Sequence, residues 1–327
     1  MHKKNFTILL TRRLPELIEK KLIQDHNVVV NIKDKPYSYK ELRKKIENVD
    51  ILVPCISDTI DSSVLKSAKK LQLIANFGNG VDNIDLITAN EKNIIVTNTP
   101  EVLTEDTADI VLTLILMLLR KVKQAETKLY HGKWDGWGPS ITHGERLSGK
   151  KLGIIGMGRI GSAVAKRALT LGLKINYHNR NKLNRLTEER FKAKYWKDLN
   201  EMLMNIDILT VHCPYTPETF HLLSKRRLRL MKKTSIIINT SRGEIVDENA
   251  LAEQLTKNKI HGVGLDVFEH EPQVSTKLLE SKNAVLLPHI SSATKESRDA
   301  MGLRVLKNIE RFSLGNIPPD RIKIRNK

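Results

Sequence analysis

The chain is poor in the residues and segments that mark secreted and membrane proteins. Only two of its 327 residues are cysteines, Cys55 and Cys213, so a disulfide framework is excluded and a reducing compartment is expected. The longest apolar run, Ile110 to Leu119, is about half the roughly 20 residues that a membrane-spanning helix needs. The apolar run near the N-terminus, Phe6 to Leu10, is too short for the core of a secretion signal. We therefore expect a soluble, cytoplasmic protein.

Acidic residues are scarce relative to basic ones. The chain has 55 Lys and Arg against 37 Asp and Glu, a formal net charge of +18. A basic stripe interleaved with aromatic residues would favour a nucleic-acid partner. Here the basic residues form short scattered clusters, such as Arg12-Arg13 and Arg226-Arg227, and aromatic residues are only 5% of the chain. We expect no nucleic-acid and no membrane partner, and we interpret the charge as a solvated surface that attracts anionic substrates.

A glycine-rich turn is the clearest motif. Gly156, Gly158 and Gly161 have the spacing G-x-G-x-x-G, between the apolar run 152–155 and a helix-compatible stretch. In this context the motif predicts a dinucleotide whose pyrophosphate lies at the N-terminus of the following helix. Gly158 would let the backbone approach the pyrophosphate without an intervening Cβ.

The residues after the next predicted strand bear on the choice of cofactor. Dinucleotide-binding units usually carry an acidic residue about 20 positions after the glycines, which binds the ribose hydroxyls. Asn179 stands there instead, followed by Arg180. An Asp would repel a 2′-phosphate, whereas Asn179 with Arg180 can accept one. This pattern favours NADP(H) and leaves NAD(H) possible; the alternative is that Arg180 is a surface residue at a strand end.

Apolar runs alternate with segments of helical periodicity along the chain. The pattern predicts an α/β protein with two doubly wound parallel-sheet, Rossmann-like domains. One long helix, apolar on all sides and mostly buried, is expected within 101–128 as a connector between domains or subunits. Strands are expected at 6–10, 28–32, 51–54, 73–76, 94–97, 152–155, 174–178, 208–212, 235–239, 262–266 and 284–287, the last six forming one sheet. Helices are expected at 39–46, 62–71, 160–171, 199–204, 224–231, 248–257 and 297–312.

Three segments with chemically useful side chains follow neighbouring strands of the second predicted sheet. Arg242 follows one strand, the segment 266–272 with its glutamates follows the next, and His289 follows the last. Parallel sheets bind ligands at the carboxyl ends of their strands. A guanidinium can hold a keto-acid carboxylate, and a histidine oriented by a carboxylate can transfer a proton to the carbonyl oxygen.

Segments spread along the whole chain resemble the D-isomer-specific 2-hydroxyacid dehydrogenase family. They are residues 78–85, 152–161, 231–243, 264–272 and 287–290. Within the family, Tyr177–Arg180 and the loop with Trp134 and Trp137 look most similar to NADPH-preferring glyoxylate/hydroxypyruvate reductases.

The resemblance implies a role for individual residues. Arg242 would be the catalytic arginine that binds the substrate, Glu271 would be the catalytic partner carboxylate, and His289 would be the general acid/base and also contact the substrate. The backbone at Asn79 and Gly80 would bind the substrate carboxylate, although many relatives have a smaller residue than Asn79. No metal is expected. The cofactor would contact Thr107, Gly156, Gly158, Arg159, Ile160, Gly161, Asn179, Arg180, Cys213, Pro214, Thr219, Thr240, Ser241 and Asp266.

The resemblance also implies an organisation and an activity. A discontinuous substrate domain, 1–100 plus 289–327, would flank a dinucleotide-binding domain, 101–288, in a homodimer packed through the long helix and the loop after it. Trp137 would either reach the neighbouring subunit's site or pack locally. The expected activity is NADPH-dependent reduction of glyoxylate or hydroxypyruvate to the D-2-hydroxy acid. The alternatives are an NAD-dependent D-lactate or phosphoglycerate-type dehydrogenase and a dehydrogenase-like co-repressor or interaction protein.

Overall fold

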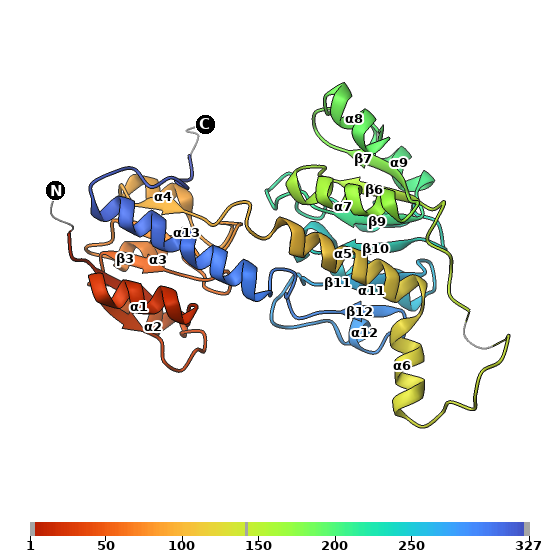
Figure 1. Cartoon of the computed structure of the whole chain (residues 1–327), viewed down its shortest axis with the longest axis horizontal. Coiled ribbons are helices and arrows are strands. Elements are labelled where there is room, and N and C mark those ends of the chain that lie inside the picture. Colours follow the sequence, from red (N-terminus) through yellow and green to blue (C-terminus); the bar gives the residue numbers. More distant parts are fainter. Residues whose placement is uncertain (1–3, 141–142, 324–327) are drawn as a thin grey trace. The chain divides into compact units, whose positions relative to one another are not determined.

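The chain forms two α/β units (Figure 1). A computed structural model describes residues 4–140 and 143–323. One unit comprises Met1–Leu103 and Ala293–Lys327, and the other comprises Thr104–Ser292. His289, which the expected boundary assigns to the substrate domain, thus lies in the second unit, because it directly follows a strand of that unit's sheet.

The first unit is built on a five-stranded parallel sheet. Its order is β2-β1-β3-β4-β5, with β1 at Thr7–Leu10, β2 at Asn27–Val30, β3 at Ile51–Val53, β4 at Leu73–Ala75 and β5 at Ile95–Thr97. The three inner strands β1, β3 and β4 are almost entirely buried. Burial on both faces explains why the sequence shows these strands as continuous apolar runs rather than as alternating patterns.

Helices cover both faces of this sheet. They are α1 (Glu16–Asp25), α2 (Tyr39–Ile46), α3 (Ser62–Ser67), α4 (Leu86–Glu91) and α13 (Lys295–Ser313). Ser38 and Glu41 form a capping box that starts α2. The C-terminal helix α13 packs Met301, Val305 and Ile309 into the core shared with α1, so the end of the chain returns to the unit that its beginning forms.

The second unit is built on a seven-stranded parallel sheet. Its order is β12-β11-β10-β9-β6-β7-β8, which confirms the predicted fold class. The bounds are β6 Lys151–Ile155, β7 Lys174–His178, β8 Lys194–Tyr195, β9 Ile208–Val211, β10 Ile236–Asn239, β11 Gly262–Leu265 and β12 Ala284–Leu286. The prediction of six strands was wrong: β8 is a two-residue edge strand, too short to produce a periodic pattern.

Helices pack on both faces of the larger sheet. One face carries α5 (Thr104–Leu119) and α7 (Arg159–Thr170), and the other carries α9 (Leu199–Asn205), α10 (Lys225–Leu228), α11 (Glu248–Thr256) and α12 (Thr276–Leu279). The remaining helices are α6 (Val122–Tyr130) and α8 (Arg185–Phe191), with a 3-10 turn at Gly243–Ile245.

The single long helix expected within 101–128 is instead two helices. Lys121 adopts a left-handed conformation (φ 52°, ψ 39°) between α5 and α6, and the carbonyl of Leu119 accepts a hydrogen bond from the Glu145 N–H at 2.7 Å. The segment is also less buried than its apolar sequence suggested. Glu105, Asp109, Thr113 and Leu116 form an exposed strip along α5, and α6 has no buried residue. Among the described helices, none is both long and apolar enough to cross a membrane.

Candidate active site

His289 and Glu271 form a hydrogen-bonded pair at one edge of the larger sheet. Glu271 lies in the segment after β11, and His289 follows β12, its neighbour in the sheet. Because the carboxyl ends of these parallel strands are adjacent, the two segments meet. His289 Nδ1 lies 2.9 Å from Glu271 Oε2, with 23% and 36% of the respective side chains exposed. The structure therefore brings together two of the three predicted catalytic side chains.

Electrostatics keep Glu271 ionised. Burial alone would raise the pKa of this carboxyl. Three contacts oppose this effect and lower the pKa: the hydrogen bond and charge of His289, the N–H of Phe268 at 3.1 Å from Oε1, and the charge of Arg242. Their sum outweighs burial, so the pKa of Glu271 lies below its usual range. An ionised Glu271 accepts the Nδ1–H of His289 and fixes its tautomer, which leaves Nε2 for a substrate.

A buried aspartate holds the backbone that carries His289. Asp266 is fully buried, and its two carboxylate oxygens accept the N–H groups of Ile290 at 2.7 Å and Ser291 at 2.8 Å. Burial raises the pKa of Asp266 in spite of these bonds. His289 itself has a left-handed backbone (φ 55°), which is uncommon for residues other than glycine, although histidine, asparagine and aspartate adopt it more often than the rest. Asp266, expected as a cofactor contact, therefore also fixes the backbone next to the predicted catalytic histidine.

Arg242 is held by a turn at the end of β10. Asn239 Oδ1 accepts the Ser241 N–H at 3.0 Å, its Nδ2 donates to the Arg242 carbonyl at 2.8 Å, and Arg242 Nη1 donates to the Ser241 carbonyl at 2.8 Å. The next residue, Gly243, packs so tightly that a Cβ there would collide with the backbone of Phe268 and Glu269. Arg242 thus lies on a segment in direct contact with the one that carries Glu271.

The glycine-rich turn has the shape of a phosphate-binding loop. Gly156 has φ 90°, and a Cβ there would lie 2.5 Å from the N atom of Cys213, so the fold itself requires glycine. A Cβ on Gly158, in contrast, would meet no protein atom within 4 Å. The fold does not require glycine at 158, but the close approach of a pyrophosphate does. Asn179 supports the turn, because its Oδ1 accepts the Met157 N–H at 2.7 Å.

Two further predicted cofactor residues carry buried oxygens that no protein group satisfies. They are Thr107 Oγ1 and Thr240 Oγ1, two of the four such side-chain atoms in the described part of the chain. Leaving a buried hydroxyl unpaired costs about 1–3 kcal/mol, so these atoms are suited to a polar ligand. Together with the open space at Gly158, they indicate that this unit fits a dinucleotide.

The other predicted cofactor residues lie around the same sheet edge. Arg159 and Ile160 begin α7, and Arg180 is exposed two residues after β7. Ser241 Oγ donates to the Cys213 carbonyl at 2.6 Å, and Thr219 Oγ1 donates to the Pro214 carbonyl at 2.8 Å. Burial raises the pKa of Cys213 to about 11, which keeps it a neutral thiol.

Asn79 and Gly80, the predicted carboxylate-binding residues, belong to the first unit. The Asn79 carbonyl accepts a hydrogen bond from Asn98 Nδ2 at 2.7 Å, and the Gly80 carbonyl accepts one from Asn76 Nδ2 at 2.8 Å. Sequence reasoning missed these two asparagines. They fix both carbonyls of the loop and thereby set the direction of its N–H groups.

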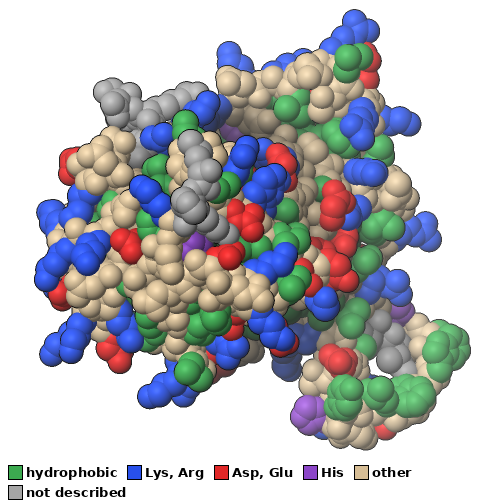
Figure 2. Space-filling model, turned by 60° about the vertical axis from the view of Figure 1, so that its left-hand side comes forward, with side chains coloured by type: hydrophobic (Ala, Val, Ile, Leu, Met, Phe, Trp, Pro, Cys, Tyr) green, Lys and Arg blue, Asp and Glu red, His purple; other side chains and the backbone are tan. Residues whose placement is uncertain are grey.

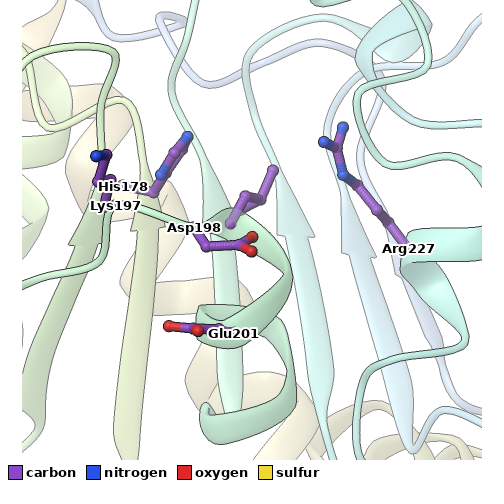
Figure 3. Close-up of a pocket in the computed structure, with 6 residues that line it drawn as sticks. His178, Lys197, Asp198, Glu201 and Arg227 are labelled. Atoms are coloured by element: carbon purple, nitrogen blue, oxygen red, sulfur yellow. The ribbon is translucent and has the colours of Figure 1, made fainter.

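A cavity of about 530 Å³ opens beyond β7, at the N-terminal end of α9 (Figure 3). In this view Asp198, the N-cap residue of α9, and Glu201 in α9 lie between His178 and Lys197 on one side and Arg227 on the other. His178 Nδ1 is 2.9 Å from the Trp196 carbonyl, and Arg227 Nε donates to Asn200 Oδ1 at 3.2 Å. None of these side chains was among the predicted site residues. Within residues 4–140 and 143–323, no group of three or more His, Cys, Asp or Glu side chains is arranged to hold a metal ion.

Comparisons with known proteins point to one family. Residues 112–291 match the model of the D-isomer specific 2-hydroxyacid dehydrogenase, NAD binding domain. A glyoxylate reductase of Thermococcus litoralis is 41% identical over 319 residues, which cover 96% of each chain. A Polaromonas structure described as a D-isomer specific 2-hydroxyacid dehydrogenase has a TM-score of 0.91 at 34% identity, covering 98% of this chain and 100% of the other. An NADPH-dependent glyoxylate/hydroxypyruvate reductase of Sinorhizobium meliloti, in complex with NADP and malonate, has a TM-score of 0.85 at 31% identity, covering 98% and 97%.

Proposed function

The chain belongs to the D-isomer specific 2-hydroxyacid dehydrogenase family, and from this membership we propose that it reduces glyoxylate or hydroxypyruvate to the D-2-hydroxy acid with NADPH. The observation that carries the proposal is the His289–Glu271 pair at 2.9 Å, with Arg242 on the adjoining segment. The glyoxylate reductase of T. litoralis and the S. meliloti reductase support this choice of substrate.

The chain's own residues account for binding and proton transfer. The Arg242 guanidinium pairs with the substrate carboxylate, and its charge polarises the neighbouring carbonyl. His289 Nε2 donates a proton to the carbonyl oxygen, while Glu271 stabilises the positive charge on the ring before that transfer. A reduced nicotinamide, when bound, supplies the hydride that the carbonyl carbon accepts.

The His212 ring is not suited to this proton transfer. His212 lies at the end of β9, with Nε2 2.8 Å from Thr210 Oγ1. Burial lowers the pKa of His212 to about 3, so its ring stays neutral near pH 7 and has no proton to spare for a carbonyl oxygen.

NADPH is the preferred cofactor in this proposal. Asn179 replaces the acidic residue that would repel a 2′-phosphate, and its side-chain oxygen is engaged by the glycine turn. Arg180 is exposed beside it, and the cavity near His178 adds the amine of Lys197. Arg180→Ala should therefore lower kcat/KM for NADPH about tenfold and leave that for NADH unchanged. Arg185→Ala, at an exposed arginine of α8, serves as the matched control.

We further propose a homodimer in a reducing compartment such as the cytoplasm. Helix α6 and the loop after it expose Leu129, Tyr130, Trp134 and Trp137. Hydrophobic side chains gather on the lobe at the lower right of Figure 2. Clustered exposed aromatic and aliphatic residues are typical of an interface, and Trp137, with 87% of its surface exposed, is available to a neighbouring subunit. The two unpaired cysteines fit the compartment.

The decisive experiment is a panel of small 2-keto acids assayed with both reduced cofactors. We expect oxidation of NADPH with glyoxylate and hydroxypyruvate, and a lower kcat/KM with pyruvate and with NADH. A preference for NADH with pyruvate or with a phosphorylated 2-keto acid would favour the lactate or phosphoglycerate type. Cofactor binding without turnover of any 2-keto acid would contradict the enzymatic proposal.

A further inference from the structure

A second histidine–carboxylate pair lies next to the catalytic one. His221 Nε2 donates to Glu269 Oε1 at 2.8 Å, and the two side chains are 30% and 11% exposed. Glu269 precedes Glu271 by only two residues, and His221 lies on the segment after β9. The reaction proposed above assigns no role to either residue.

Glu269 and Glu248 bind one another's backbone. The N–H of Glu248, at the start of α11, donates to Glu269 Oε2 at 3.3 Å, and the N–H of Glu269 donates to Glu248 Oε2 at 2.9 Å. Glu248 Oε1 also accepts the N–H of Ser275 at 3.4 Å. Glu269 thus connects three segments, which follow β9, β10 and β11 and carry His221, Arg242 and Glu271.

These contacts lead directly to the catalytic carboxylate. Phe268, the residue before Glu269, donates its N–H to Glu271 Oε1, while Glu271 Oε2 faces His289. The backbone of Phe268 and Glu269 also packs against Gly243 without space for a Cβ. If this backbone moved, Gly243 and its neighbour Arg242 would have to move with it.

His221 is partly exposed, yet contacts fix both its backbone and its ring. Its backbone is left-handed (φ 46°), its N–H donates to the Glu244 carbonyl at 2.8 Å, and the Phe220 ring stacks on it at 4.0 Å between centroids. A partly exposed hydrogen-bonded pair of this kind contributes only about 0–1 kcal/mol, which does not offset a cost of about 1–3 kcal/mol for a left-handed backbone. Strained residues cluster where function needs a defined geometry.

We propose that His221 and Glu269, with Glu248, are positioning residues. They hold the Glu271 carboxylate against His289 and fix the position of the Arg242 segment relative to Glu271. The proposal rests on the proposed function for its kinetic readout but not for its structural one. Neither His221 nor Glu269 touches the reacting atoms, and both act through Glu271.

The test compares Glu269→Gln and Glu271→Gln with the double variant. We expect Glu269→Gln to lower kcat about tenfold, with a change of less than twofold in KM for NADPH. The pH dependence of kcat/KM should shift in the same direction as in Glu271→Gln. Because Glu269 acts through Glu271, the double variant should be no slower than Glu271→Gln. Multiplicative losses in the double variant, or an unshifted pH profile, would overturn the proposal.

Two further variants separate positioning from simple destabilisation. His221→Gln removes the ring and keeps a donor, so it should lose less kcat than Glu269→Gln while following the same pH shift. Glu253→Gln, on the same helix as Glu248 but paired with Lys225 and Lys257, should leave kcat unchanged. If Glu269→Gln does not fold, His221→Gln alone tests the proposal. The pH dependence of its kcat/KM must then shift in the same direction as in Glu271→Gln.

A structural readout is independent of turnover. In a crystal structure of Glu269→Gln, or of His221→Gln if only that variant folds, the distance between His289 Nδ1 and Glu271 Oε2 should exceed hydrogen-bond range. A retained distance near 2.9 Å would refute the positioning role even if no 2-keto acid is turned over. A wild-type protein without activity, but with the pair separated in the variant, would refute only the proposed function.

Discussion

At the residue scale, His289 combines a strained backbone with two supporting carboxylates. Asp266 holds the N–H groups that follow it, and Glu271 holds its Nδ1. A left-handed backbone at a non-glycine residue costs about 1–3 kcal/mol and persists only where surrounding contacts enforce it. Both carboxylates provide such contacts, and the result is an imidazole with a fixed direction.

Replacing His289 by asparagine tests its role with little disturbance of the fold. Asparagine tolerates the left-handed backbone but has no ionisable ring. We expect kcat for glyoxylate reduction to fall about 10²–10⁴-fold, KM to change by less than fivefold, and the Tm to stay within about 3 °C, as for loss of a general acid. His261→Asn, at another partly exposed histidine, should keep wild-type kcat. Comparable losses in both variants would place the acid elsewhere.

The lowered pKa of Glu271 predicts how the pair depends on pH. A carboxyl whose pKa is lower in the folded than in the unfolded protein stabilises the fold above its unfolded pKa of about 4.3. That contribution disappears as the pH falls through the folded value. The free energy of unfolding of the wild type should therefore exceed that of Glu271→Gln at pH 6–7, and the difference should shrink towards pH 3. Denaturant titrations at several pH values measure it; a difference that grows in acid would contradict the ionised pair.

At the scale of elements, the sequence predicted what regular patterns encode. Buried parallel strands appear as apolar runs, and eleven of the twelve strands in the described residues lie inside or within one residue of a predicted one, β8 being the exception. The break at Lys121 was not predictable, because a left-handed lysine leaves no pattern of hydrophobicity. The capped helices α4 and α8 were also missed, because each is too short to produce a clear hydrophobic period.

In the candidate site, too, some residues could be placed from the sequence pattern and others only from the structure. Arg242 and His289 could be placed at a sheet edge, because each directly follows an apolar strand. The choice of Glu271 over Glu269 came from the family resemblance, and the hydrogen bonds of the structure gave the two glutamates different partners. His221 lies far from both in sequence, and only its position beside the strand-end segments reveals its partner.

The glycine turn allows the requirements of the fold and of the cofactor to be separated. A Cβ at Gly158 meets nothing, whereas one at Gly161 would collide with the Gly156 carbonyl oxygen. Gly158→Ala should change the free energy of unfolding by about 1 kcal/mol or less and weaken NADPH binding at least tenfold. Gly161→Ala should instead lower stability by about 1–3 kcal/mol. Denaturant unfolding and fluorescence titration of NADPH measure the two effects; equal cofactor affinity in wild type and Gly158→Ala would contradict the assigned phosphate position.

At the scale of the whole molecule, charge and apolar surface have different distributions. The +18 net charge comes from basic residues scattered over both units, and several of the ion pairs join well-exposed side chains. Such pairs contribute about 0–1 kcal/mol each, so the charge chiefly governs solubility and the attraction of anions. The exposed apolar side chains of α6 and its loop are, in contrast, close together in sequence.

The homodimer proposal can be tested on one matched pair of substitutions. Tyr130 at the end of α6 and Leu186 in α8 are about equally exposed, at 81% and 78%, but only Tyr130 belongs to the cluster with Leu129, Trp134 and Trp137. A buried charge at the centre of an interface costs several kcal/mol, whereas one in water costs little. We expect sedimentation to give twice the chain mass of 37.2 kDa for the wild type and for Leu186→Glu, and a shift towards the single-chain mass for Tyr130→Glu, with unchanged Tm at low concentration. A monomeric wild type, or a Tyr130→Glu dimer as tight as the wild type, would contradict an interface at α6.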